Sequence, residues 1–211
     1  VIAHATWGKI DQALDDAARH GPPVDALHLL CHGAPIGSGY GLAFDDEAQP
    51  GSAVVVDAGR VQQLLAPHAG MVRLVVLSAC DSGNAGDPGN HLGSVAQMIH
   101  RAGLQAVVAS RFPLSTAGST RFAQAFYGAL ARDREPLEEA FLTARDALMR
   151  DPGQLDWASV QLYSRDADGA ATFPLHLSSG TSTPTPAIAA PSPAPAPPVS
   201  TPARARKLAL G

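Results

Sequence analysis

The chain has 211 residues, of which 45% are hydrophobic, 16% are charged and 5% are aromatic, a length that fits one or at most two domains. Fifteen Lys and Arg residues against nineteen Asp and Glu residues give a net charge of −4, which excludes a strongly basic nucleic-acid binder. No apolar stretch reaches the roughly 18 residues that a membrane-spanning helix needs.

A helix and several strand-like segments are predicted first. In residues 7–20 (WGKIDQALDDAARH), apolar side chains recur at helical spacing, and Gly-Pro-Pro at 21–23 ends the pattern. Residues 26–31 (ALHLLC) form a short apolar run that is typical of a buried strand. Residues 33–41 are rich in glycine and indicate a turn region, and residues 41–57 predict a hairpin with the arms GLAF and SAVVVD.

Helices and strands then alternate along the chain. Helices are predicted over residues 58–66, 91–102, 115–133 and 136–150, and strands over residues 71–79, 105–110 and 160–163. The strand at 71–79 (MVRLVVLSA) is the strongest in the chain, and it runs directly into Cys80. Strands separated by helices indicate βαβ units and a mostly parallel sheet that is covered on both faces.

A proline-rich segment follows. Eight of the eighteen prolines lie within residues 178–203, where no side chain is charged or aromatic. Such a segment cannot bury enough apolar surface to offset its ordering entropy, so we expect a disordered, extended linker. A ligand for SH3-like domains is the weaker interpretation, because no basic residue flanks the prolines at a useful spacing. Residues 204–211 are either the start of a further segment or the end of an expressed fragment.

Residues 1–177 are expected to form the globular domain. They hold twelve basic and nineteen acidic side chains, a net charge of −7, and all eleven aromatic residues. The chain begins with Val1 rather than methionine and shows no signal peptide, so we expect a piece of a longer, cytoplasmic protein.

Two predicted strands end on side chains that can carry chemistry. The strand at 26–31 is followed by His32, and the strand at 71–79 by Cys80. Sites in open α/β sheets form at the carboxyl ends of the strands, so the two side chains converge if the strands are neighbours. A cysteine with a histidine is the minimum for a thiolate nucleophile and its base, and backbone N–H groups at Gly33 and Cys80 can line an oxyanion hole. The competing interpretation is a buried, structural cysteine.

Other kinds of site are less well supported. Two cysteines are too few for a disulfide-rich scaffold or a cysteine-based zinc finger. His28 and His32 lie about 13 Å apart on a strand, too far for one metal ion, so His28 is expected in the core or on a sheet face. The glycines at 37–41 are not followed by the helix of a nucleotide loop. We therefore expect neither a metal nor a cofactor. The other histidines considered are expected at the surface or at helix ends: His20, His68, His91 and His100.

The same residues resemble a known family. His32-Gly33 after an apolar strand and VVLSACDSG around Cys80 resemble the His-Gly and L-S-A-C-[DE]-[ST]-G motifs of the CHAT peptidases, caspase-like cysteine proteases related to separase. Three downstream segments match further family motifs in order: GNHLGSVAQMIHRAGLQAVVASRFPLS, RFAQAFYGALARDREPLEEAFLTAR and DWASVQLYS. The resemblance covers roughly residues 24–165. It implies a caspase-like three-layer α/β/α sandwich with a mostly parallel central sheet, and a CHAT peptidase domain over residues 1–177.

The resemblance also implies roles for individual residues. Cys80 would be the nucleophile, and His32 would activate it and protonate the leaving amine. The backbone amides of Gly33 and Cys80 would bind the developing oxyanion, and no third catalytic side chain is required. Residues expected to shape a substrate pocket are Ser78, Asp81, Arg111, Phe112 and Thr116.

One position departs from the family pattern. Relatives commonly carry L-W-x-V-x-D after the V-V-A-S strand, and the last carboxylate is thought to bind a basic P1 side chain. This chain has Thr116 at that place, and a hydroxyl does not select Arg or Lys as a carboxylate does. Arg111 would favour an acidic P1 residue, remain solvated at the strand end, or form a structural ion pair. Cys31 lies on the opposite strand face from His32 and is expected in the core.

Two classes of function follow from the resemblance. The first is a cysteine endopeptidase that cleaves protein or peptide substrates, the effector module of a regulated bacterial signalling or defence protein. Regulatory or sensor domains would then lie beyond the linker in the same polypeptide. The alternative is a catalytically silent, caspase-like protein–protein interaction module. Neither class requires direct contact with nucleic acid or a membrane, and the oligomeric state stays open.

Overall fold

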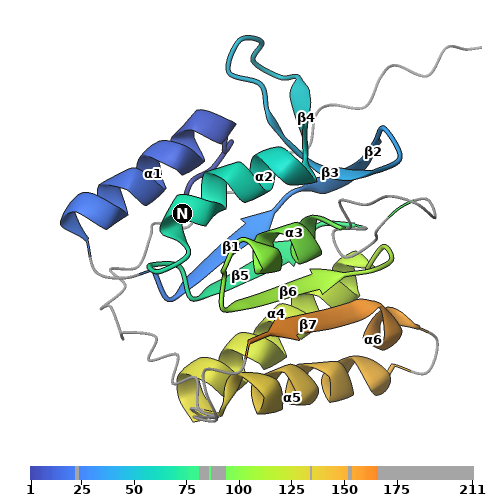
Figure 1. Ribbon diagram of the computed structural model, residues 1–211. Coiled ribbons are helices and arrows are strands. Elements are labelled where there is room, and N and C mark those ends of the chain that lie inside the picture. Colours follow the sequence, from blue (N-terminus) through green and yellow to red (C-terminus); the bar gives the residue numbers. More distant parts are fainter. Residues whose placement is uncertain (22–23, 81–85, 87–93, 134, 152–153, 166–211) are drawn as a thin grey trace, which may run out of the picture. The chain divides into compact units, whose positions relative to one another are not determined.

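The computed structural model describes residues 1–21, 24–80, 86, 94–133, 135–151 and 154–165, and it has the predicted mixed α/β architecture (Figure 1). The chain divides into the units Val1–Leu177 and Ser178–Gly211, and the predicted linker and terminal segment lie outside the described residues. The helices are α1 (Trp7–His20), α2 (Ala58–Leu65), η1 (Ala66–His68), α3 (Val95–Arg101), α4 (Thr116–Gly128), η2 (Ala129–Asp133), α5 (Leu137–Met149) and α6 (Asp156–Ser159). The strands are β1 (Ala26–Leu30), β2 (His32–Ile36), β3 (Gly39–Asp45), β4 (Ala53–Asp57), β5 (Leu74–Ser78), β6 (Ala106–Ser110) and β7 (Val160–Ser164).

The central sheet has the strand order β1-β5-β6-β7. β1, β5 and β6 are parallel to one another, and β7 pairs with β6 in the antiparallel direction. The mostly parallel sheet is therefore confirmed. The run LVVLS forms β5 in the interior of this sheet because it is apolar on both faces, and its first four residues are all buried.

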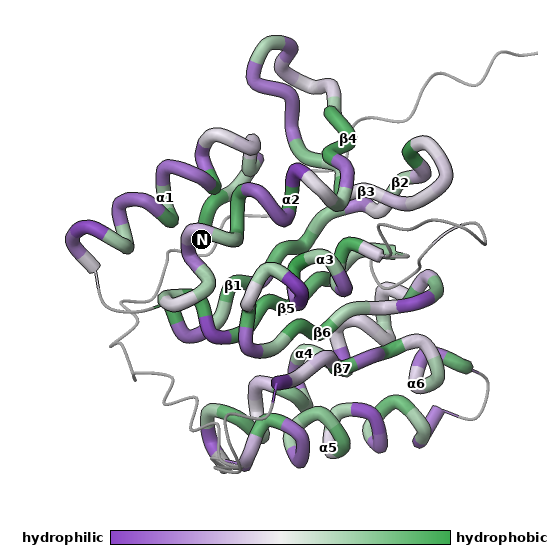
Figure 2. Tube along the Cα trace, in the orientation of Figure 1, coloured by the Kyte–Doolittle hydropathy of each residue, from purple (hydrophilic) through white to green (hydrophobic). Residues whose placement is uncertain are grey.

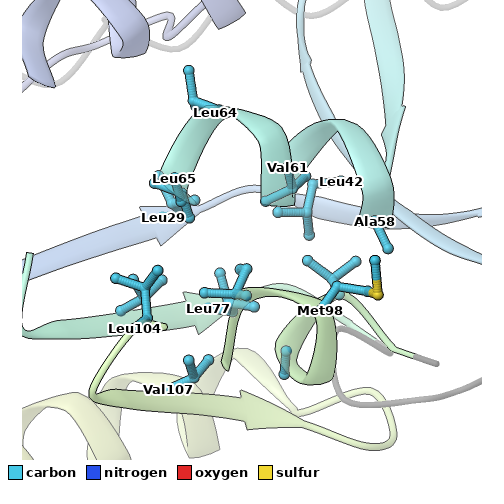
Figure 3. Packing of buried hydrophobic residues seen from close by; sticks show 14 of the residues in the cluster. Leu29, Leu42, Ala58, Val61, Leu64, Leu65, Leu77, Met98, Leu104 and Val107 are labelled. Carbon is cyan, nitrogen blue, oxygen red and sulfur yellow. The ribbon is translucent and has the colours of Figure 1, made fainter. Parts of the chain in front are cut away.

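Helices cover both faces of the central sheet, as the alternation of patterns predicts. Figure 1 shows α1, α2 and α3 on one side and α4 and α5 on the other. Successive side chains of β5 point to opposite faces of the sheet. Val75 and Leu77 pack in the cluster with α1, α2 and α3, whereas Leu74 and Val76 pack in the cluster with α4 and α5. Figure 3 shows the first cluster, and Figure 2 shows the apolar strands between more polar outer helix faces.

Side-chain caps set where two helices begin. The Thr6 hydroxyl accepts the Lys9 N–H at the start of α1 (3.3 Å). At α3 the Ser94 hydroxyl accepts the Gln97 N–H (3.2 Å), and the Gln97 side chain accepts the Ser94 N–H (3.0 Å). This reciprocal cap starts α3 at Val95, later than the predicted boundary at residue 91, and residues 91–93 lie outside the described part. Within the described residues, no helix has both the length and the apolar composition to cross a bilayer.

A second, antiparallel sheet has the order β2-β3-β4. It corrects the prediction that residues 33–41 form a glycine-rich turn region, because all but 37–38 of them lie in β2 and β3. Glycine serves close packing here, since a β-carbon on Gly41 would press on the backbone of Val56 in β4. The turn itself is short and contains Gly37 at φ +58°.

Candidate active site

The pairing of β1 with β5 brings the two predicted catalytic residues to the same end of the sheet. These strands are parallel neighbours, with Leu30 opposite Ser78, and the Cys31 N–H donates to the Ser78 carbonyl (3.3 Å). His32 and Cys80 each stand two residues beyond that matched pair. Both therefore leave adjacent strands at their carboxyl ends, the usual place for a site in an α/β sheet.

Gly33 packs directly on the backbone of Cys80. A β-carbon at position 33 would lie 2.8 Å from the Cys80 carbonyl carbon and would overlap the carbonyl oxygen. The backbone at the start of β2 therefore lies directly against the backbone of Cys80, which follows β5. The His-Gly pair is explained by this contact, because any side chain at position 33 would push the Cys80 backbone away.

The backbone just before Cys80 is held from the neighbouring strand. The Ser110 hydroxyl at the end of β6 donates to the Ala79 carbonyl (2.9 Å). Both residues are buried, with 2% and 5% of their surfaces exposed, so water does not compete for the bond. The two residues before Cys80 are thus held from both neighbouring strands. The Ser78 carbonyl accepts the Cys31 N–H on one side, and the Ala79 carbonyl accepts the Ser110 hydroxyl on the other.

Ser78 belongs to a hydrogen-bonded relay that the sequence did not reveal. Its hydroxyl lies 2.6 Å from His28 Nε2, and His28 Nδ1 lies 3.0 Å from the Tyr127 hydroxyl. Although His28 is exposed by surface area, the atoms packed around its ring disfavour the charged form and lower its pKa, and burial raises the pKa of Tyr127 to about 12. The signal available in the sequence was a histidine within an apolar strand, and it correctly placed His28 on a sheet face.

The loop from β6 to α4 presents Arg111 and Phe112 to solvent. Phe112 is 52% exposed, and the Arg111 guanidinium carbon lies 5.4 Å from the centre of its ring. Among the described residues, Arg111 forms no ion pair with a carboxylate. The structural ion pair considered for Arg111 is therefore not found in that part of the chain.

The single turn α6 clasps this loop. The Ser159 hydroxyl donates to the Phe112 carbonyl (2.6 Å) and accepts the Phe112 N–H (2.8 Å), and the Ser159 carbonyl accepts the Arg111 N–H (2.8 Å). Asp156, only 7% exposed, accepts the N–H (3.2 Å) and the hydroxyl (2.6 Å) of Ser115. We define these contacts as the α6 clasp, and they fix the loop that adjoins the end of β6.

An apolar groove also reaches the candidate base. It has a volume of about 920 Å³ and is lined by the whole of β1, by Cys31 and His32, by residues 1–5 and by part of α1. No residue of β5 lines it, so the groove follows the other edge of β1. His32 is thus one of the residues that line this groove.

Comparison with protein families places this geometry in context. The family model of the CHAT domain matches residues 3–165, most of the described chain. The chain belongs to the CHAT family. CHAT is a caspase-like, cysteine-peptidase-related domain, which agrees with a mostly parallel sheet between two helical layers. A search of curated proteins returned no match to the chain.

Thr116 stands where the CHAT motif carries a carboxylate, and it lies at the start of α4. Thr116 is the first residue of that helix and is exposed, and the preceding Ser115 caps it by accepting the Gly118 N–H (2.9 Å). The nearby carboxylate is that of Asp156, which approaches from α6. A β-carbon on Gly118 would overlap it. Asp156 was missed from the sequence, where it appears only as the residue before Trp157.

The remaining predicted residues divide clearly. Cys31 packs against the buried cluster of α1, α2 and α3, and burial raises its pKa to about 12, so the predicted core position is confirmed. Asp81 lies outside the described residues, as does His91. His20, His68 and His100 lie at helix ends as predicted, and His68, the last residue of η1, is also buried.

Proposed function

We propose that this CHAT domain is a cysteine endopeptidase with Cys80 as nucleophile and His32 as base. The observation that carries the proposal is the parallel pairing of β1 and β5, which sends both residues from adjacent strand ends. The contact of Gly33 with the Cys80 backbone supports the proposal, because it holds the segment that carries His32 against the segment that carries Cys80.

The first half of the reaction forms a covalent intermediate. His32 takes the proton of the Cys80 thiol, and the sulfur attacks the carbonyl carbon of the scissile peptide bond. The oxygen that gains negative charge accepts hydrogen bonds from the N–H groups of Gly33 and Cys80. The C–N bond then breaks, the amine leaves with the proton from His32, and a thioester remains on Cys80.

The second half restores the enzyme. His32 removes a proton from water, and the resulting hydroxide attacks the thioester carbonyl. The C–S bond breaks, the carboxylic product leaves, and the proton returns to the Cys80 sulfur. Neither half requires a metal or a redox cofactor, since the bonds change only by proton transfer and acyl transfer.

The substrate pocket lies between the end of β5 and the loop after β6. Ser78 and Asp81 flank the nucleophile in sequence, and Arg111, Phe112 and Thr116 come from the loop and the first turn of α4. With a threonine at the family's acidic position and an arginine that pairs with no carboxylate of the described chain, the preferred P1 side chain is acidic.

A regulated effector role fits the rest of the sequence. The proline-rich residues 178–203 suit a tether to regulatory or sensor domains in the same polypeptide of a bacterial signalling or defence protein. Both cysteines of the chain are free thiols, and a thiolate nucleophile works best in a reducing compartment, so we place the protein in the cytoplasm.

The test is cleavage of a peptide library by the full chain and by two single-cysteine variants. Cys80→Ala should abolish cleavage, and Cys31→Ala, the matched control, should retain it. If no condition yields cleavage that depends on Cys80, the peptidase is refuted and the interaction module is favoured. His32→Ala then distinguishes a Cys80–His32 dyad from Cys80 acting alone. A dyad loses its activity when the histidine is removed, whereas a nucleophile that acts alone keeps it.

A further inference from the structure

A second cluster of polar side chains lies away from the candidate active site. Asp11 and Asp15 are one turn apart on α1, and His68 is the last residue of η1. One ligand atom from each residue lies within 4.8 Å of the others. Two carboxylates and an imidazole thus converge from two separate elements of the fold.

His68 is the unusual member, because its imidazole is buried while both carboxylates are exposed. The residue is only 6% exposed, and its side chain pairs, within the described residues, only with Asp15, at 3.8 Å between Nε2 and Oδ1. That separation is too long for a hydrogen bond. The imidazole of a buried residue therefore lies against the two carboxylates without a hydrogen bond to either.

The backbone at this residue is held in a turn. The His68 carbonyl accepts the N–H groups of both Met71 (2.9 Å) and Val72 (2.8 Å), in the turn that leads into β5. The side chain itself is buried, so few rotamers are open to it, which favours the binding of a ligand that needs fixed geometry.

We propose that Asp11, Asp15 and His68 form a zinc site. Carboxylate oxygens and an imidazole nitrogen bind Zn²⁺ at about 2.0–2.2 Å, and a tetrahedral ion would take water as its fourth ligand. His68 Nε2 and Asp15 Oδ1 are 3.8 Å apart, whereas two ligand atoms of a tetrahedral zinc ion are about 3.3 Å apart. Small side-chain rotations would therefore bring both atoms onto one ion. The nitrogen ligand disfavours Ca²⁺ and Mg²⁺, which prefer oxygen.

The surroundings supply the expected outer contact. Arg19 Nη2 lies 3.5 Å from Asp15 Oδ2, so one carboxylate oxygen is oriented by a cation while the other faces His68. The same guanidinium group reaches Asp16, at 3.5 Å, which lies beside the cluster but is not part of it. Two carboxylates balance the charge of the ion.

The ion would join α1 to η1 at the start of β5, whereas Cys80 follows the other end of that strand. Its role is therefore to strengthen the fold rather than to take part in acyl transfer. This inference does not depend on the proposed peptidase, and failure of one leaves the other intact.

The experiment uses the full chain with Cys80→Ala, because a cysteine beside a histidine would itself bind zinc. Titration with ZnCl₂ in a calorimeter should give one ion per chain. The midpoint of thermal unfolding should rise by roughly 5–10 °C at a hundredfold excess over Kd, with no rise in Mg²⁺ or Ca²⁺.

Single substitutions in this background test the ligands. Asp11→Asn and Asp15→Asn should each weaken zinc binding by roughly tenfold or more. Asp16→Asn is the matched control and should bind as the parent does. His68→Asn should abolish binding, and if it fails to fold, the two exposed aspartates still decide the matter. Absence of zinc binding, or equal binding by all three aspartate variants, overturns the proposal.

Discussion

The carbonyl oxygen of Cys80 occupies the place where a β-carbon of residue 33 would stand. Only glycine can follow His32 without moving the backbone of the candidate nucleophile. A side chain as small as that of alanine would separate the two segments that carry His32 and Cys80.

Gly33→Ala should therefore lower kcat/KM by roughly a hundredfold, as expected for a displacement of about 1 Å at the reacting atoms. Gly70→Ala is the matched control, because no atom lies within 4 Å of the position of its β-carbon and activity should be unchanged. Cleavage of one peptide by both variants measures the effect. Equal rates would show that the contact has no catalytic importance.

The two cysteines should differ sharply in reactivity. Burial raises the pKa of Cys31 to about 12, which leaves about one thiolate in 10⁴–10⁵ molecules near pH 7.5. Iodoacetamide should therefore modify Cys80 first, and His32→Ala should slow that reaction. Mass spectrometry of digested protein follows each site. Faster modification of Cys31 would contradict the assignment of core and nucleophile.

The α6 clasp should control substrate binding more than chemistry. Ser159→Ala removes two hydrogen bonds to the Phe112 backbone, so we expect a loss of about 1–2 kcal/mol in unfolding free energy. KM should rise by roughly threefold to tenfold with a smaller change in kcat, since the loop is mispositioned while the dyad is intact. Ser164→Ala, on an exposed serine at the end of β7, is the control. A change confined to kcat would refute a positioning role.

Arg111 should determine the charge of the preferred substrate. If it pairs with an acidic P1 side chain, Arg111→Glu should reverse the preference toward basic P1 residues, with a change of roughly tenfold or more in relative kcat/KM. Arg111→Gln should flatten the preference. Profiles from a library varied at P1 provide the measurement, and unchanged profiles would exclude Arg111 from the pocket.

Stability should fall as the pH drops below the ordinary histidine pKa of 6.5. Burial lowers the pKa of His28, so below that pH the unfolded chain binds a proton that the folded chain does not. The stabilisation is complete above pH 6.5 and is lost below it. His28→Gln should reduce the difference in urea midpoint between about pH 7.5 and 5.5, whereas Gln12→Ala, at an exposed residue of α1 that does not titrate, should not. An identical pH dependence in both variants would contradict this origin.

The central sheet could be predicted because its signals are local. The run before Cys80 is apolar on both faces, which only a covered strand requires, and the next strands repeat the pattern. The sequence made the convergence of His32 and Cys80 conditional on their strands being neighbours, and the parallel pairing of β1 with β5 meets that condition.

The errors arose where the role of a residue depends on a distant partner. Gly33 falls in the predicted turn region, although it lies in β2 against a backbone that only the folded chain provides. Asp156 and His68 gave no local signal either. The first is recognisable only beside Ser115, and the second only beneath α1.

The dyad spans two separate sheets. Cys80 follows a strand of the central sheet, but His32 is the first residue of β2, in the three-stranded sheet. Because Gly33 of β2 packs on the backbone of Cys80, this single contact also joins the three-stranded sheet to the central sheet. A substitution that widens the contact would therefore shift β2 relative to β5, and its effect would reach both sheets.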